Sequence, residues 1–124
     1  MIVNEALAGR AADLLQCVEL LVSRGSSRIS DAETLGILGR LGMGADLLQR
    51  EINIARTAIA PIPPQEVAHA LRNPLTAIIG YSEILIDEND DGIRDELLAI
   101  YSGANDILEL INRAIAAALV NPPT

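Results

Sequence analysis

Four apolar seams run along this chain, and they limit the folds open to it more than any single residue does. In each seam, aliphatic or small residues recur at steps of three or four, the spacing that places them on one face of an amphipathic helix. No stretch shows sustained alternation with a period of two, so the sequence predicts no β-strand. The chain has no Phe or Trp and only two Tyr, so its core must be aliphatic, as in helix bundles. We therefore expect an all-α protein.

The seams predict four helices joined by short connections, which makes consecutive helices antiparallel. Their residues are, helix by helix, Val3, Leu7, Ala11, Leu14, Val18 and Leu21; Leu38, Leu41, Ala45, Leu48, Ile52, Ala55 and Ile59; Val67, Leu71, Leu75, Ile78, Ser82 and Leu85; and Ile93, Leu97, Ile100, Ala104, Ile107, Ile111, Ala114 and Ala118. The first helix is expected over about 3–23, the third over about 65–86 and the fourth over about 93–119. Gly25-Ser26-Ser27 should end the first helix, and a capping box of Ser30 and Glu33 should open the second.

Four glycines lie inside the predicted second helix: Gly36, Gly39, Gly42 and Gly44. Each costs about 1 kcal/mol relative to alanine, so the cluster needs an explanation. Either a neighbouring helix approaches closely, or the helix is locally irregular, and periodicity does not choose between the two. A nucleotide-binding glycine loop is disfavoured, because no strand precedes the cluster and the chain contains no lysine.

Pro61-Ile62-Pro63-Pro64 divides the chain into two helical hairpins. Residues 1–60 form an N-terminal hairpin of unassigned role, and residues 61–124 form the second. An isolated hairpin cannot bury its apolar stripe on both sides, so the second must pack on the first, on a second copy of itself, or on both. We expect antiparallel hairpins that form a four-helix bundle across a homodimer.

Charge and composition exclude several classes of partner. There are 9 basic residues, all arginine, against 17 acidic ones, and the net charge of -8 argues against nucleic acid and anionic membranes. The longest apolar runs fall far short of the about 20 residues of a membrane span, and the start lacks the basic region of a secretory signal. Cys17, the single cysteine, suits a reducing compartment and is predicted to be a core residue. We expect a cytoplasmic protein.

His69 is the only histidine, and a neutral imidazole is a good nucleophile near pH 7. At about 100° per residue, Thr76 and Gly80 lie about 20° from it around the helix, and Asn73 and Glu83 about 40°. Its face is opposite the seam, so His69 should project outward at the head of a stripe of small residues. A partner protein could approach it closely there.

Two charged residues flank the histidine within one turn. Glu66 is positioned to accept a hydrogen bond from one ring nitrogen, which would leave the other free to attack, and Arg72 to offset the charge of a phosphoryl group. Pro74 cannot donate to the carbonyl of Ala70, so a bend is expected just past the histidine.

The run from His69 to Leu85, with His69-Ala70-Leu71-Arg72-Asn73-Pro74-Leu75-Thr76 at its head, resembles the H-box of the dimerisation and histidine-phosphotransfer (DHp, HisKA-like) domain of two-component sensor histidine kinases. The stretch 107–112 resembles the second helix of that domain. The resemblance covers about half of the chain and implies a homodimeric four-helix bundle with His69 as phosphoacceptor on its outer face. It also implies a response-regulator receiver domain as partner. We expect Thr76, Gly80 and Glu83, on the outward face that carries His69, to contact this partner.

One departure from the family pattern bears on activity. The family usually carries Glu or Asp directly after the histidine, where it assists attack on ATP, and this chain has Ala70. Asn73 keeps a residue type associated with orienting water for phosphatase action. No ATP-binding domain follows in this sequence, so autophosphorylation and a bound cofactor are not expected, whereas exchange with a receiver aspartate is, with a separate kinase as a possible donor. The alternatives are a catalytically silent dimerisation or scaffold module and a fragment of a full sensor kinase.

The acidic turn over 87–95 resembles the start of a calcium-binding EF-hand loop. Its twelfth position, which should supply a bidentate Glu, is Leu98. Acidic residues that favour the dipole of the following helix are the better explanation. No metal site is expected.

Overall fold

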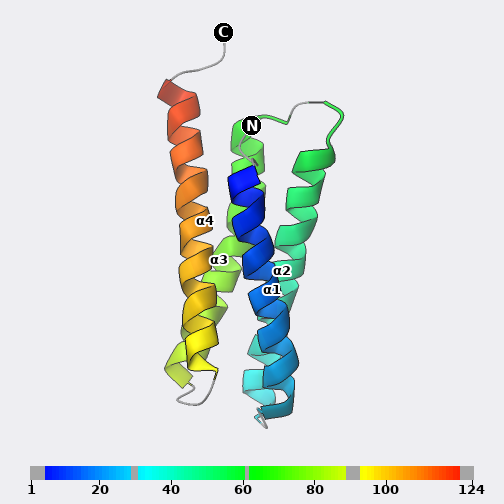
Figure 1. Cartoon of the computed structure of the whole chain (residues 1–124), viewed down its shortest axis with the longest axis vertical. Helices are drawn as coiled ribbons and strands as arrows, with labels where there is room; N and C mark the ends of the chain where they lie inside the picture. The colour runs from blue at the N-terminus through cyan, green and yellow to red at the C-terminus, as the bar shows by residue number, and fades with distance from the viewer. Residues whose placement is uncertain (1–4, 29–30, 61, 89–92, 121–124) are drawn as a thin grey trace.

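Four α-helices and no strand make up the part of the chain that the computed structural model describes, which is residues 5–28, 31–60, 62–88 and 93–120. The helices are α1 (Glu5–Arg28), α2 (Ala32–Thr57), α3 (Pro64–Glu88) and α4 (Arg94–Val120). They run alternately up and down, so that consecutive helices are antiparallel (Figure 1). The predicted all-α fold is confirmed.

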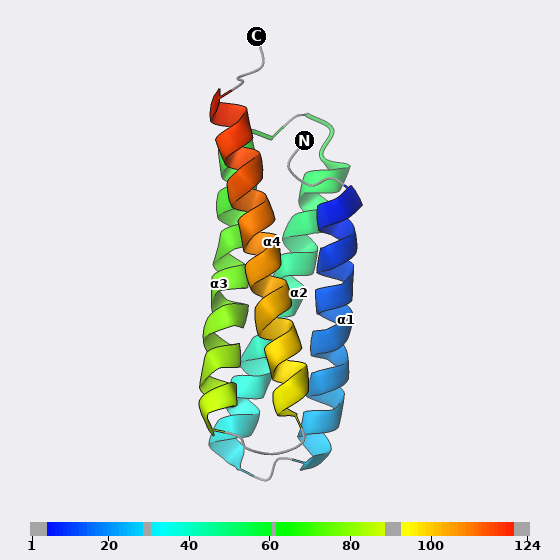
Figure 2. The ribbon, with the colours of Figure 1, turned by 60° about the vertical axis from the view of Figure 1, so that its left-hand side comes forward.

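The helices stand at the corners of a square. Each packs against two neighbours, α1 on α2 and α4, and α3 on α2 and α4, whereas α1 lies diagonal to α3 (Figures 1 and 2). One chain therefore closes a four-helix bundle, with the N-terminal hairpin against the apolar face of the α3–α4 hairpin. The sequence left open whether the second hairpin packs on the first, on a second copy of itself, or on both; in the structure it packs on the first hairpin of the same chain. The homodimer stays a prediction. With the apolar faces already covered within one chain, a dimer would form either by exchange of hairpins between two chains or through the outer surface of the bundle.

The core is the one that the four seams predict. Its buried residues are Leu7, Ala11, Leu14, Val18, Leu21, Leu38, Leu41, Ala45, Leu48, Ile52, Ala68, Leu71, Leu75, Ile78, Leu85, Ile93, Leu97, Ile100, Ala104, Ile107 and Ile111, together with Ser82. The predictions fail toward the ends of seams, where Ala55 and Ala114 are also only half-buried. Ile59 is fully exposed beyond the end of α2, and Ala68 is buried in place of the half-buried Val67. Val3 and the Ala118 side chain lie outside the described residues.

Two predicted helix ends are wrong. α1 continues through Gly25-Ser26-Ser27 to Arg28, because Gly25 is buried against the bundle and that packing outweighs the helical cost of one glycine, about 1 kcal/mol. α2 is capped by Asp31, one residue after the predicted Ser30, which lies outside the described residues. Asp31 Oδ2 accepts hydrogen bonds from the Thr34 hydroxyl at 2.7 Å and the Thr34 N–H at 3.0 Å. These bonds, the hydroxyl first, lower the pKa of the Asp31 carboxyl.

The glycines of α2 divide into two kinds. A Cβ built on Gly44 would lie 3.3 Å from Cγ1 of Ile78 on α3, and one on Gly42 would lie 3.5 Å from Val22 on α1. Gly36 and Gly39 face open space. Since α2 is a continuous helix, close approach explains Gly44, and no local irregularity is found.

Cys17 is exposed, so its prediction as a core residue is wrong. Its neighbour Val18 occupies the seam, and one step of about 100° turns the thiol out of the core. α3 is assigned as one helix across Pro74. Within the described residues, no helix is both long and apolar enough to span a membrane.

Candidate functional site

His69 lies on the second turn of α3 and is exposed. Leu71, about 160° from His69 around the helix, and Ala68, about 100° from it, are fully buried and fix the helix in the bundle. Within the described part of the chain, the imidazole makes no hydrogen bond or ion pair. Both ring nitrogens are therefore open to solvent and to a reacting group, as the outward projection predicted from the helical spacing requires.

Glu66 does not make the suggested hydrogen bond to His69. Its exposed carboxylate instead borders a hollow of about 160 Å³ between α2 and α3, whose walls include Glu51, Val67 and Ala70. Ala70 thus lines the same hollow as two acidic residues, Glu51 and Glu66. An acidic side chain at position 70 would add to the negative charge around this hollow, which gives a local reason why alanine is suited to this position.

Arg72 is held from the other side of the site. Its Nη2 donates a 2.7 Å hydrogen bond to Oδ1 of Asn112 on α4. Because Asn112 is a neutral amide, the bond orients the guanidinium without neutralising its charge. The sequence did not single out Asn112, although it ends the 107–112 stretch; the pairing of α3 with α4 was needed to find it.

The outer stripe of α3 is accessible as predicted. Asn73, Thr76 and Glu83 are exposed, and Gly80 is half-buried. A Cβ built on Gly80 would meet nothing within 4 Å. The bundle itself therefore does not require glycine at position 80, and the space above it is free for another molecule.

A groove between α2 and α3 adjoins this stripe, and sequence reasoning missed it. It has a volume of about 530 Å³. Its lining residues come from both helices and include Arg40, Met43, Leu47 and Arg50 of α2 and Asn73, Pro74, Ala77 and Tyr81 of α3. One sequence pattern could have predicted this groove. Met43 and Leu47 are apolar residues outside the seam of α2, and they lie between two arginines in the sequence.

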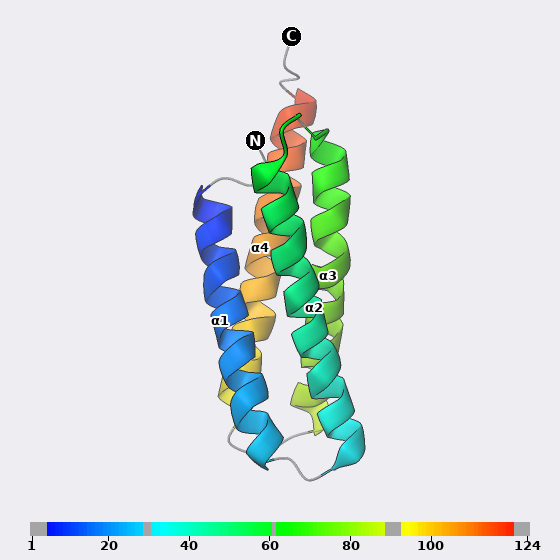
Figure 3. The ribbon, with the colours of Figure 1, turned by 90° about the vertical axis from the view of Figure 1, so that its right-hand side faces the viewer.

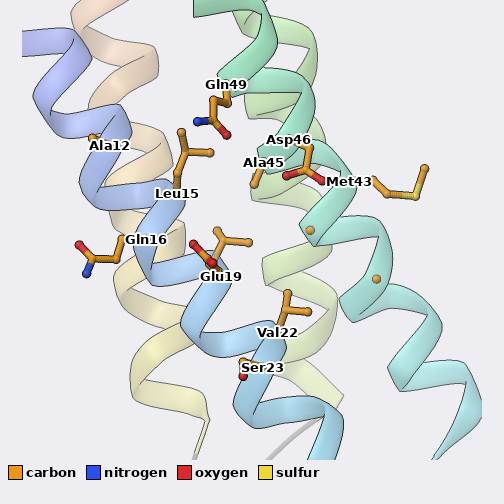
Figure 4. Close-up of a pocket in the computed structure, with 13 residues that line it drawn as sticks. Ala12, Leu15, Gln16, Glu19, Val22, Ser23, Met43, Ala45, Asp46 and Gln49 are labelled. Atoms are coloured by element: carbon orange, nitrogen blue, oxygen red, sulfur yellow. The ribbon is translucent and has the colours of Figure 1, made fainter.

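A second hollow, of about 830 Å³, lies between α1 and α2 (Figure 4). Leu15 and Val22 of α1 and Ala45 of α2 give it an apolar floor, and Glu19 and Asp46 face it from opposite helices. None of the predicted site residues lines it.

No cluster of three or more His, Cys, Asp or Glu side chains among the described residues could hold a metal ion. The central part of the acidic turn, 89–92, lies outside the described residues. Leu98, at the position where a calcium loop needs its glutamate, is exposed on α4.

Comparisons with known proteins agree with the geometry of α3 and α4. Residues 65–118 match the model of the His Kinase A (phospho-acceptor) domain family. The cell-division control histidine kinases PdhS of Brucella ovis, Brucella suis and Brucella anthropi are each 41% identical to this chain over 51 residues. The match covers 37% of this chain and 5% of each relative, so the chain spans a small part of their length. No solved structure matches the chain significantly.

Proposed function

Since residues 65–118 form a His Kinase A (phospho-acceptor) domain, we propose that this chain is a histidine phosphotransfer module of a two-component system or phosphorelay. His69 carries the phosphoryl group and exchanges it with the aspartate of a response-regulator receiver domain. A cytoplasmic location is part of this proposal. The observation that carries it is the exposed and unbonded His69 inside the matched segment, at the head of an accessible stripe.

The proposed step is a phosphoryl transfer between nitrogen and oxygen. The lone pair of one neutral ring nitrogen attacks the phosphorus of the receiver's acyl phosphate, a P–N bond forms, and the P–O bond breaks to release the carboxylate. The proton already on the other ring nitrogen stays there, so no proton has to be removed. In the reverse direction the carboxylate attacks the phosphorus, and neutral imidazole leaves. The exposed ring can reach a partner from outside the bundle.

Arg72 and Asn73 shape the site in this proposal. Arg72 follows His69 by about 60° around α3, on the side of α4, and Asn112 holds its charge in place. Positive charge beside the phosphoryl oxygens stabilises the charge spread over them during transfer. Asn73 lies toward α2, where its amide can bond a phosphoryl oxygen or a water molecule. Glu66 lines the hollow between α2 and α3 and does not bond His69, so we propose only that its negative charge contributes to the electrostatic environment of the site.

Ala70 favours exchange with a receiver over attack on ATP. An acid directly after the histidine would assist that attack, and this chain has a half-buried methyl group there, beside Glu51 and Glu66. The phosphoryl group then reaches His69 from a phosphorylated receiver or from a separate kinase.

The test is labelling of the chain by a phosphorylated receiver domain. Wild-type protein should gain an acid-labile, alkali-stable phosphoryl group, as expected for a P–N bond, and His69→Gln should gain none while its helical circular dichroism is unchanged. Asn53→Gln, which alters an exposed residue of α2, serves as the control and should label normally. Equal labelling of His69→Gln and wild type would overturn the proposal.

The second candidate is a silent dimerisation or scaffold module. Ala70 favours it, because loss of the acid is one step toward loss of the chemistry. Such a module would bind its partner equally well after His69→Ala, and its label would be absent in wild type too. Light scattering on the same samples separates one chain per particle from the predicted homodimer.

A further inference from the structure

We propose that α2, which lies outside the matched domain, supplies half of the surface on which the receiver domain docks. The surface, here the docking groove, consists of Arg40, Met43, Leu47 and Arg50 of α2 with Asn73 and Tyr81 of α3. This inference rests on the proposed function and extends it to a partner-selecting role for the N-terminal hairpin.

The first argument is exposed apolar surface. Met43 is 71% exposed and Leu47 is 42% exposed, although both belong to a helix that already buries a complete seam. Met43 borders both the α1–α2 hollow and the docking groove, and its side chain points away from α1 (Figure 4). An exposed methionine beside a leucine offers an adaptable apolar contact, which suits a protein partner.

The second argument is charge. Arg10, Arg24 and Arg113 pair with carboxylates, and Arg72 bonds Asn112. Among the described residues, Arg40 and Arg50 make no ion pair or hydrogen bond, and Asp46, which also lines the groove, pairs with neither. Two arginines against one aspartate give the groove a net positive charge on a chain whose own net charge is -8. Such a patch attracts an anionic partner.

The third argument is continuity with His69. Gly44 lies beside Pro74, Ala77 and Ile78, and α2 and α3 are antiparallel neighbours (Figure 3). Because both helices rise about 1.5 Å per residue, Arg50 stands near the level of His69 and Arg40 near that of Gly80. The docking groove therefore runs along the same stretch of α3 as the exposed stripe, and Asn73 belongs to both.

These arguments select the receiver domain as occupant. The receiver brings a carboxylate and a phosphoryl group to His69, and both are anionic, so a cation at the level of His69 favours its approach. A second copy of the chain carries the same net charge of -8 and brings no such complement. The side chains of α2 would then help to decide which receiver is accepted.

The experiment separates docking from chemistry. His69 is first phosphorylated with phosphoramidate, a small donor that needs no docking surface, and transfer to a receiver is then timed. The receiver is the one in a panel of receiver domains that wild-type protein labels fastest. Once both proteins are phosphorylated to the same extent, the double variant Arg40→Glu/Arg50→Glu should transfer at least about tenfold more slowly than wild type. Met43→Ala should slow transfer less and without a change in salt dependence.

The matched control is Arg56→Glu. Arg56 is exposed on the same helix, makes no bond or ion pair among the described residues, and lies about 120° around α2 from Arg50, away from the docking groove. Its variant carries the same change of charge per site and should transfer at the wild-type rate. If the double variant does not fold, Arg40→Gln and Arg50→Gln are measured against Arg56→Gln by the same criterion.

The outcomes are distinguishable. An undiminished transfer rate in the folded double variant, or an equal loss in Arg56→Glu, overturns the docking groove and leaves the proposed function standing. Wild-type protein that labels with phosphoramidate but transfers to no receiver overturns both. A two-chain particle that the double variant converts to single chains assigns the groove to a second copy and also overturns the inference.

Discussion

Gly44 on α2 packs so closely against Ile78 on α3 that an added Cβ would lie 3.3 Å from Ile78 Cγ1 and 3.7 Å from the carbonyl oxygen of Pro74. Ile78 is completely buried, so its side chain has little room to move away, whereas the distance to the Pro74 carbonyl is that of an ordinary van der Waals contact. This contact joins the N-terminal hairpin to the helix that carries His69. A comparison of Gly44 with a glycine of α2 that has no close neighbour therefore separates the effect of glycine on helix propensity from its effect on packing between helices.

We expect Gly44→Ala to lower the free energy of unfolding by about 1 kcal/mol, because overpacking at a buried contact outweighs the gain in helix propensity. Gly36→Ala, in open space on the same helix, should raise it by about 1 kcal/mol. Urea denaturation followed by circular dichroism measures both. Equal stabilisation by the two substitutions would show that a Cβ at position 44 fits between α2 and α3 without overpacking.

Replacement of Ser82 on α3 by alanine should stabilise the folded protein. Its hydroxyl is completely buried and has no hydrogen-bond partner among the described residues, and such a group costs roughly 1–3 kcal/mol. Ser82→Ala should raise the free energy of unfolding by about 1 kcal/mol more than Ser102→Ala. Ser102 is exposed on α4, so its change gains helix propensity alone. No difference between the two would mean that the Ser82 hydroxyl is satisfied in solution.

The N-cap of α2 should make stability depend on pH in a defined direction. The bonds from Thr34 lower the pKa of Asp31 in the folded chain, so the charged cap stabilises the fold above the unfolded pKa of about 3.9, and this contribution is lost as the pH falls through the lower folded pKa. Asp31→Asn keeps an acceptor and removes the titrating group. Its Tm should therefore fall less than that of wild type below about pH 4.

Asp31→Ala is the control for the cap itself. It removes the acceptor as well as the charge, so its Tm should be lower than that of wild type near neutral pH. Parallel curves of Tm against pH for wild type and Asp31→Asn would contradict a charged cap.

Asn112 should act on phosphotransfer through Arg72. Asn112→Asp converts a neutral acceptor into an anion, which pairs with the guanidinium and reduces the positive charge available to the phosphoryl group. We expect slower transfer between His69 and the receiver by several-fold, with stability changed by less than about 0.5 kcal/mol because Asn112 is exposed. Asn112→Gln keeps a neutral amide and should transfer faster than Asn112→Asp. Equal transfer rates for the two variants would show that the charge of Arg72 does not contribute to phosphotransfer.

The periodicity of the sequence was sufficient to predict the core and the outward face of His69. Seam residues such as Leu71 and Ile107 are buried because a helix that repeats apolar residues at three and four must turn that side to its neighbours. The same rule placed His69 outside, since it is about 160° from Leu71 around α3. These features depend only on a residue's place within its own helix.

Features that depend on two helices at once were not predicted. The hydrogen bond of Arg72 to Asn112 requires the relative height of α3 and α4, and the docking groove requires the rotation of α2 about its axis. The end of α1 failed for the same reason, because burial of Gly25 against the bundle decides whether the helix continues. The start of α2 is decided locally, by the bonds of Thr34 to Asp31. One seam alone contains none of this information.

Closure of the bundle within one chain has a consequence for stoichiometry. Because α1 and α2 cover the apolar face of α3 and α4 in the same molecule, dilution does not dissociate the core, and its stability should be independent of protein concentration. A bundle assembled from two phosphotransfer hairpins would present two histidines, whereas this one presents His69 alone. Each folded chain would then hold either no phosphoryl group or one, with no half-occupied state between them.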